Sequence, residues 1–152
     1  MKIEYEPLFQ AGFHDITSSQ LEQVFLNPFP DSAQRKYLIQ RFKAFLANLD
    51  HVGINFEIWL DGSFSTQKPD PEDIDLVLLC SKNDLNNITN EQMSIFNDLT
   101  KNKNICKIRY GCDVYLCYNE DEPMKSYWRG WFGFSRNETA KGIPRLKYVC
   151  DK

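Results

Sequence analysis

The stretch Ile74-Asp75-Leu76-Val77-Leu78-Leu79-Cys80 decides the fold of this chain. It is a nearly continuous apolar run with one charge near its start, which is typical of a strand covered on both faces of its sheet. Such a strand needs helices to cover it, and a helical pattern lies on each side of it in the sequence. The sequence therefore predicts a sheet-and-helix unit of the α/β class built around residues 74–80.

Helical spacing is clearest upstream of this strand. Asp31, with Gln34 three residues later, marks a helix start, and a helix is predicted over 32–49. The apolar residues that recur there at helical spacing are Leu38, Phe42, Phe45, Leu46 and Leu49. Shorter helices are predicted over 18–26 and 90–100, because each region begins with a Thr that has a Gln three residues later.

Two further strands are predicted beside the central one. Apolar and polar residues alternate over 54–60, as in a half-buried strand. The run over 112–118 reads as a third strand, and residues 105–110 are expected to extend it or to pair beside it. After Pro123 the chain is rich in aromatic residues, Arg and Gly and has no clean period.

Length and composition limit the architecture further. The chain has 152 residues, of which 42% are hydrophobic and 26% charged, so one soluble globular domain is predicted over 1–152. Within it we expect an extended arm or lid at 1–16, a core at 53–118 and an aromatic, basic tail at 119–152. This size excludes a barrel enzyme of about 250 residues and a two-domain dehydrogenase.

The sequence also carries signs of its compartment. It contains no apolar run of about eighteen residues that could span a membrane, and its N-terminal residues lack a secretory segment. Five cysteines are an odd number, which favours reduced thiols over a set of disulfides. We therefore expect a cytoplasmic protein with no membrane partner.

Charge is distributed unevenly along the chain. Residues 1–100 carry 7 basic and 15 acidic side chains, a net of −8, whereas residues 101–152 carry 11 and 6, a net of +5. An acidic body with a basic tail is compatible with a polyanionic ligand such as a nucleotide or RNA, and equally with a solvated basic surface.

Three acidic residues lie where strands begin. Asp73 and Asp75 are two positions apart at the start of the central strand, so both carboxylates point to one face. Asp113 opens the next apolar strand in the same way, and if the two strands are neighbours all three carboxylates meet at one edge of the sheet. Carboxylates at such a place are unfavourable unless a cation neutralises them, and an oxygen-rich site suits Mg²⁺. The spacing predicts a metal site formed by Asp73, Asp75 and Asp113.

A glycine and a serine precede the acidic pair. Gly62 permits close approach of the backbone to a phosphate, and the hydroxyl of Ser63 can donate a hydrogen bond to its oxygens. Nine residues separate Ser63 from Asp73.

Together these residues resemble the polymerase-β-type nucleotidyltransferase superfamily. Its signature is a glycine and a serine, a spacer of about nine to thirteen residues, and two acids around an apolar residue, which matches Gly62-Ser63 and Asp73-Ile74-Asp75. Asp113-Val114-Tyr115 matches the third acid of that superfamily. The chain also resembles a small stand-alone bacterial nucleotidyltransferase-like family with no established substrate. The stretches that carry this second resemblance are Asp61 to Phe64, Tyr127 to Phe134 and Lys141 to Ile143.

The resemblance implies a mixed β-sheet flanked by helices, and transfer of a nucleoside monophosphate from an NTP, with ATP favoured. Asp73 and Asp75 would bind two Mg²⁺ or Mn²⁺ ions, and Asp113 would complete one site and help to deprotonate the acceptor hydroxyl. Gly62 and Ser63 would hold the terminal phosphates. The acceptor implied is a protein, an RNA end or a small molecule, in a toxin–antitoxin or phage-defence setting.

Cations that could contact the phosphates are few near the motif. Many superfamily members place an Arg shortly after the Gly-Ser pair, where this chain has Lys68. In the tail, Arg136 and Lys141 lie near glycines, where the backbone can turn toward a ligand.

Alternatives to catalysis stay open at this stage. The absence of that Arg, and of a helical acceptor domain after Asp113, favours a nucleotide-binding regulatory module that has lost turnover. A structural subunit with a fortuitous acid pair is the third possibility. In the tail, Trp128, Trp131, Phe132 and Phe134 are expected mostly to pack, although such rings can also stack on a base.

Overall fold

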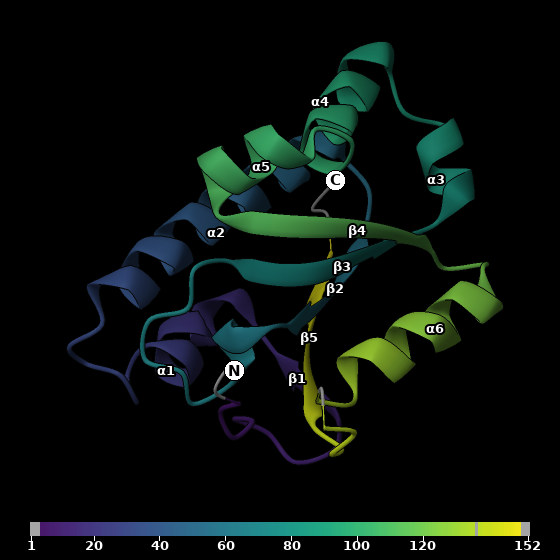
Figure 1. The fold of residues 1–152 in the computed structure, drawn as a ribbon. Helices are drawn as coiled ribbons and strands as arrows, with labels where there is room; N and C mark the ends of the chain where they lie inside the picture. Colours follow the sequence, from purple (N-terminus) through teal and green to yellow (C-terminus); the bar gives the residue numbers. More distant parts are fainter. Residues whose placement is uncertain (1–3, 136, 150–152) are drawn as a thin grey trace.

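The structure is a computed structural model, and it describes residues 4–135 and 137–149. Five strands form one mixed sheet in the order β1-β5-β2-β3-β4 (Figure 1). β1 is parallel to β5 and β3 is parallel to β4, whereas β2 is antiparallel to both β5 and β3. The strands are β1 Gly12–Ile16, β2 Phe56–Asp61, β3 Ile74–Cys80, β4 Cys112–Tyr118 and β5 Gly142–Tyr148.

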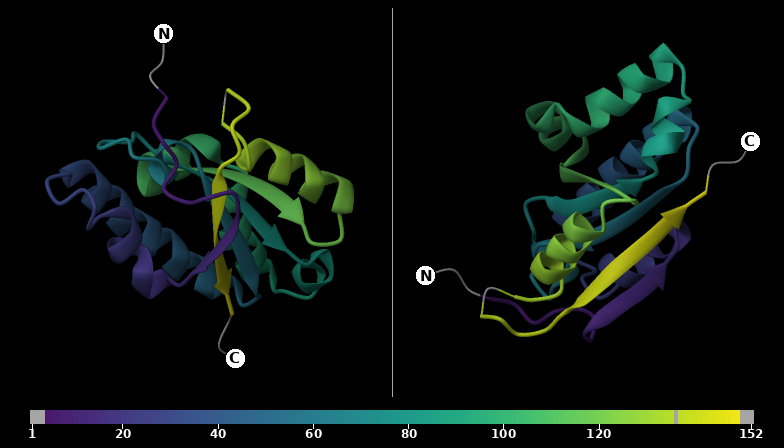
Figure 2. Two further views of the ribbon diagram at one scale, coloured as in Figure 1. Left: turned by 90° about the horizontal axis from the view of Figure 1, so that it is seen from below. Right: turned by 90° about the vertical axis from the view of Figure 1, so that its right-hand side faces the viewer.

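Helices cover both faces of this sheet. They are α1 Leu21–Phe25, α2 Ala33–Val52, α3 Lys82–Asn86, α4 Asn90–Thr100, α5 Lys103–Tyr110 and α6 Glu122–Phe132, with 3₁₀ turns η1 Ser18–Gln20 and η2 Ser63–Ser65. Figures 1 and 2 show α2, α4 and α5 on one face and α6 on the other. The predicted α/β (α+β) class, a mixed sheet flanked by helices, is confirmed.

The central strand sits between two apolar cores. Leu76 and Leu78 of β3 belong to the large core under α2, α4 and α5, whereas Val77 and Leu79 face the smaller core under α6. All four side chains are fully buried. The apolar run that opened the sequence analysis is therefore covered on both faces, as its composition predicts.

Helix α2 differs slightly from the predicted 32–49. The residue that caps it is Ser32 instead of Asp31, since the Ser32 hydroxyl accepts a hydrogen bond from the Arg35 N–H at 3.0 Å. The helix runs on to Val52 and ends where Gly53 adopts a left-handed conformation (φ 78°).

The expectation that residues 105–110 extend or pair beside the third strand is wrong. They lie in α5, which begins after Asn102, whose side chain accepts from the Ile105 N–H, and ends at Gly111 in the left-handed region (φ 65°). Cys106 and Tyr110, one helical turn apart, are buried in the large core. This burial outweighs the strand preference of the isoleucines at 105 and 108.

The arm and the tail both contribute to the sheet. Residues 12–16 of the arm form β1, and the tail supplies β5, which lies between β1 and β2. The tail also forms α6, whose first turn is capped by Asp121 and includes Pro123. The segment without a clean period in the sequence is thus a helix followed by a strand.

The cysteines and the helices of the described residues can be compared with the sequence. The four cysteines of the described residues are buried and unpaired, whereas Cys150 lies outside those residues. Within 4–135 and 137–149, no helix is both long enough and apolar enough to cross a membrane.

Candidate functional site

Strand register brings three acids side by side at one end of the sheet. Asp75 of β3 lies opposite Asp61 of β2 and opposite Asp113 of β4. The three residues stand on the face of their strands that also carries Trp59 and Val77, the face that α6 covers. The predicted neighbourhood of Asp75 and Asp113 is therefore present, and Asp61 joins it.

Asp61 was not predicted as a site residue. It is the last residue of β2, where the alternation of apolar and polar positions already points it to the same face as Trp59. Because β2 is antiparallel to β3, the end of one strand meets the start of the other. The sequence alone does not show that β2 and β3 are antiparallel, and without that pairing Asp61 could not be placed beside Asp75.

Asp73 precedes β3 and completes the group. Its carboxylate lies 3.2 Å from the ammonium group of Lys107 on α5. The charge of Asp73 is also close enough to raise the pKa of Asp75. We call Asp61, Asp73, Asp75 and Asp113 the acidic edge.

Lysines neutralise three members of the acidic edge. Besides the Asp73 pair, the ammonium group of Lys103 lies 3.4 Å from Asp113, and that of Lys141 contacts Asp61. Tyr115 donates a hydrogen bond to the second oxygen of Asp113 at 2.9 Å, so that both oxygens of this carboxylate are engaged. Asp75 has no ion pair among the described residues.

Burial and the neighbouring acids change the pKa of Asp75 most strongly within the acidic edge. Burial, together with the like charges of Asp73, Asp113 and Asp61, raises the pKa of its carboxyl to about 7. Burial also raises the pKa of Asp61, against the opposing effect of Lys141. Near neutral pH, ionisation of Asp75 is therefore costly unless a cation lies beside it.

The chemistry of this donor set fits a hard divalent cation. Three acids are neighbours across adjacent strands, and one of them, Asp75, lacks a cationic partner among the described residues. As the side chains stand, no three His, Cys, Asp or Glu residues of the described part form a ready metal-binding group, and the lysines accompany the acids instead. Mg²⁺ or Mn²⁺ would be held by Asp73, Asp75 and Asp113.

Gly62 packs directly against Asp75. Its φ of 74° lies in the left-handed region, and a Cβ built there would overlap Oδ2 of Asp75. Ser63 follows at the start of η2, a turn closed by the Ser65 N–H donating to the Gly62 carbonyl at 3.2 Å. Gly62 of the Gly-Ser pair thus lies in contact with Asp75, thirteen residues later in the sequence.

Replacing Gly62 by Ala is expected to lower the melting temperature and to move Asp75. The strained φ costs about 1–3 kcal/mol, and each kcal/mol is worth roughly 2–4 °C in a chain of this size. The matched control is Gly130→Ala in α6, where a Cβ meets nothing within 4 Å and Ala should stabilise the helix. Differential scanning fluorimetry gives both values, and equal melting temperatures would contradict the assignment.

Of the three cations predicted to bind phosphate, only Lys141 lies at the acidic edge within the described residues. Lys141 reaches the acidic edge through Asp61. Lys68 follows η2, and it is its carbonyl that is engaged, accepting hydrogen bonds from Arg35 at 2.7 and 3.2 Å; its side chain forms no ion pair among the described residues. Arg136 lies outside the described residues.

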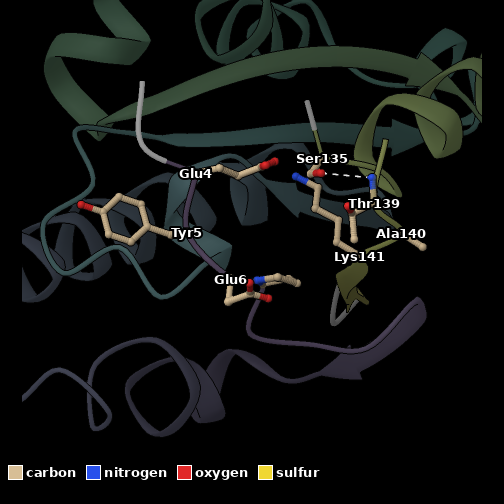
Figure 3. A pocket seen from close by; sticks show the side chains of 8 residues that line it. Glu4, Tyr5, Glu6, Ser135, Thr139, Ala140 and Lys141 are labelled. Carbon is tan, nitrogen blue, oxygen red and sulfur yellow. Dashed lines mark hydrogen bonds between the residues drawn. The ribbon is translucent and has the colours of Figure 1, made fainter. Parts of the chain in front are cut away.

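A small pocket opens next to Lys141. It has a volume of about 80 Å³ and lies between the N-terminal arm and the segment that precedes β5 (Figure 3). In the figure, the Glu4 side chain points toward Ser135 and Lys141, and Tyr5 points away from them. Since Lys141 also contacts Asp61, this pocket borders the acidic edge.

A buried arginine holds the Gly-Ser loop in place. The guanidinium of Arg35, on α2, donates to the carbonyls of Phe64 (2.9 Å), Thr66 (2.8 Å), Lys68 and Phe25 (3.0 Å). Arg35 is fully buried, and burial lowers its pKa to about 10, which leaves it charged at neutral pH. Its place on the apolar face of α2 was the one sequence signal for this role.

The comparisons with known proteins give a family. A model of a family described as of unknown function, DUF6932, matches residues 1–147. No curated protein and no solved structure matches the chain. The match covers nearly the whole sequence, including the acidic edge, the Gly-Ser loop and α6. The chain belongs to the family of unknown function DUF6932.

Proposed function

We propose that this protein is a Mg²⁺-dependent nucleotidyltransferase that moves a nucleoside monophosphate from an NTP to an acceptor hydroxyl. One observation carries the proposal: Asp75 lies between Asp61 and Asp113, has no cationic partner among the described residues, and touches Gly62 of a Gly-Ser loop. An ionised acid in such a position lowers the stability of the folded protein, and a bound cation together with phosphates would offset that loss.

In the proposed reaction, the acceptor oxygen forms a bond to the α-phosphorus and the bond between that phosphorus and the bridging oxygen to the β-phosphate breaks. Pyrophosphate leaves, and the proton of the acceptor passes to Asp113. Bound Mg²⁺ would neutralise charge on the triphosphate and align it.

The chain's own residues have distinct tasks. Gly62 lets the backbone approach the terminal phosphates, and the Ser63 hydroxyl donates to them. Tyr115, by donating to one oxygen of Asp113, fixes the orientation of that carboxylate. Lys103 and Lys107, more than half exposed, are free to turn toward phosphate oxygens once the acids have another cation.

The proposal extends to the setting. NTPs and reduced thiols belong to a cytoplasmic environment, and a toxin–antitoxin or phage-defence context rests on analogy with short transferases alone.

The direct test is pyrophosphate release from each of the four NTPs with Mg²⁺ or Mn²⁺. We expect release with at least one NTP, and a loss of about 100- to 10,000-fold in Asp113→Asn, since a positioned general base typically contributes that much. Asp50→Asn, on the exposed surface of α2, is the matched control and should be unchanged.

Two outcomes would contradict the proposal. If no NTP stabilises the protein in a thermal-shift assay with Mg²⁺, the site binds no nucleotide. If an NTP stabilises the protein but no pyrophosphate appears with any acceptor tried, the chain is a binding module without turnover. The lysines already paired with the acidic edge are the observation that favours this second candidate.

A further inference from the structure

An exposed apolar stripe runs along α6, next to the residues of the helix that pack on the sheet. Met124, Tyr127 and Trp131 follow at positions i, i+3 and i+7 and are 40%, 51% and 63% exposed. We call these three residues the α6 stripe. The other aromatic residues of the helix, Trp128 and Phe132, pack against the small core. The aromatic residues of α6 therefore divide into two that pack on the sheet and two, Tyr127 and Trp131, that are exposed.

The α6 stripe is continuous with the acidic edge. Tyr115, which donates to Asp113, contacts Trp128 with ring centroids 4.8 Å apart and the rings tilted by 38°. Trp128 contacts Tyr127 at 5.1 Å, and Tyr127 contacts Trp131 at 6.2 Å. A chain of rings thus leads from the proposed general base to the surface.

Positive charge lies at the inner end of this chain of rings. The ammonium group of Lys103 is 3.8 Å from the centroid of the Tyr115 ring and 3.4 Å from Asp113. The tail that carries α6 belongs to the basic third of the sequence. Rings that can stack and a cation beside them are the features by which proteins bind unpaired nucleic acid.

We propose that the α6 stripe binds the unpaired 3′ end of an RNA acceptor. Tyr127 and Trp131 stack on two of its bases, Lys103 contacts a phosphate, and the terminal 3′ hydroxyl reaches Asp113. The 3′ oxygen then bonds to the α-phosphorus of the NTP, its proton passes to Asp113 and pyrophosphate leaves. This inference rests on the proposed function and names the acceptor for it.

RNA fits this surface better than a protein partner does. The ring contacts that lead from the α6 stripe through Trp128 and Tyr115 end at a carboxylate and an ammonium group, which is a place for a hydroxyl and a phosphate. In addition, the Trp128 indole N–H is buried and has no acceptor among the described residues, so this layer holds one unsatisfied hydrogen-bond donor.

The test measures RNA binding without NTP. A short fluorescein-labelled single-stranded RNA is titrated with the full chain, and its anisotropy is followed at low and moderate salt. Tyr127→Ala and Trp131→Ala should each weaken binding about 5- to 150-fold, which is the loss expected for one stacked base. Trp131→Phe should restore most of the affinity.

The matched control is Tyr37→Ala on α2. Tyr37 is 52% exposed, as Tyr127 is, but lies on the opposite face of the sheet beside Arg41. We expect its removal to leave RNA affinity unchanged. An equal loss in Tyr37→Ala and Tyr127→Ala would overturn the assignment, because binding would then be diffuse.

The outcomes separate this inference from the proposed function. If RNA binds through the α6 stripe but no nucleotide is ever transferred, the inference stands as a binding site and the proposed reaction fails. If transfer occurs but Tyr127→Ala and Trp131→Ala leave both RNA affinity and RNA labelling unchanged, the inference is wrong. Unchanged RNA affinity combined with loss of self-association in Trp131→Ala would show a protein interface instead.

Discussion

Asp75→Asn is expected to abolish nucleotidyl transfer while making the metal-free protein more stable. The amide cannot supply the negative charge that a divalent cation requires, and losses of several kcal/mol in the transition state correspond to about 1,000-fold in rate. At the same time the substitution removes a half-buried carboxylate that stands among three like charges. We expect a gain on the order of 1–2 kcal/mol after solvent screening.

The pH dependence of this gain follows from the raised pKa of Asp75. The carboxyl titrates near 3.8 in the unfolded chain and near 7 in the folded protein. Below about pH 4 both states are protonated. Between these values the unfolded chain loses the proton first, so folding stability falls as the pH rises, and above about 7 the penalty is constant.

Thermal unfolding in EDTA at about pH 4 and at about pH 8 measures the effect. The melting temperature of Asp75→Asn should exceed that of the wild type by more at the higher pH, whereas Asp50→Asn should shift equally at both. A gain of the same size at both pH values would show that Asp75 is not a strained acid. A variant that transfers nucleotides at the wild-type rate would disprove the role assigned to this residue.

Much of the acidic edge could be predicted from the sequence because Asp75 and Asp113 lie near the N-terminal ends of β3 and β4. Asp75 and Asp113 both open apolar runs, and two such runs in a parallel pair must bring their starts together. Asp61 was not predicted as a site residue because β2 pairs with β3 in the antiparallel direction, and no local sequence signal shows the direction of that pairing. The contacts of Lys103 and Lys107 with the acidic edge were not predicted, because residues 105–110 of α5 were expected to form a strand.

The failure at α6 has a different cause. A surface helix shows its period when apolar residues occupy one face only. In α6 the apolar residues do follow helical spacing and form one broad face, on which Phe132 is buried, Trp128 is partly buried and the α6 stripe is exposed. The helix was missed because Gly130 and Gly133, which disfavour helix, lie among these aromatic residues.

Arg35→Met should cost about 3–5 kcal/mol of unfolding free energy, the largest stability effect expected in this chain. Four carbonyls, two of them on the Gly-Ser loop at Phe64 and Thr66, would lose their donor. The hydrogen bonds to Phe25 and Phe64 are buried and the others are partly buried, so water could replace the lost donor only in part. Because η2 leads directly from Gly62, we also expect the loop to loosen and Mg²⁺–NTP binding to weaken in any fraction that folds.

A second arginine of α2 provides the control for this prediction. Arg41, also on α2, donates to the carbonyls of Arg109 (3.0 Å) and Lys107 (3.3 Å), but at the surface, where water can replace it. Urea unfolding of Arg41→Met should therefore show a loss below about 1 kcal/mol. If Arg35→Met does not fold, Arg35→Lys remains informative, since lysine keeps the charge but not the planar set of donors that reaches several carbonyls at once. Losses for Arg35→Lys no larger than those for Arg41→Met would mean that burial of positive charge alone, and not the guanidinium geometry, holds the loop that carries Gly62 and Ser63.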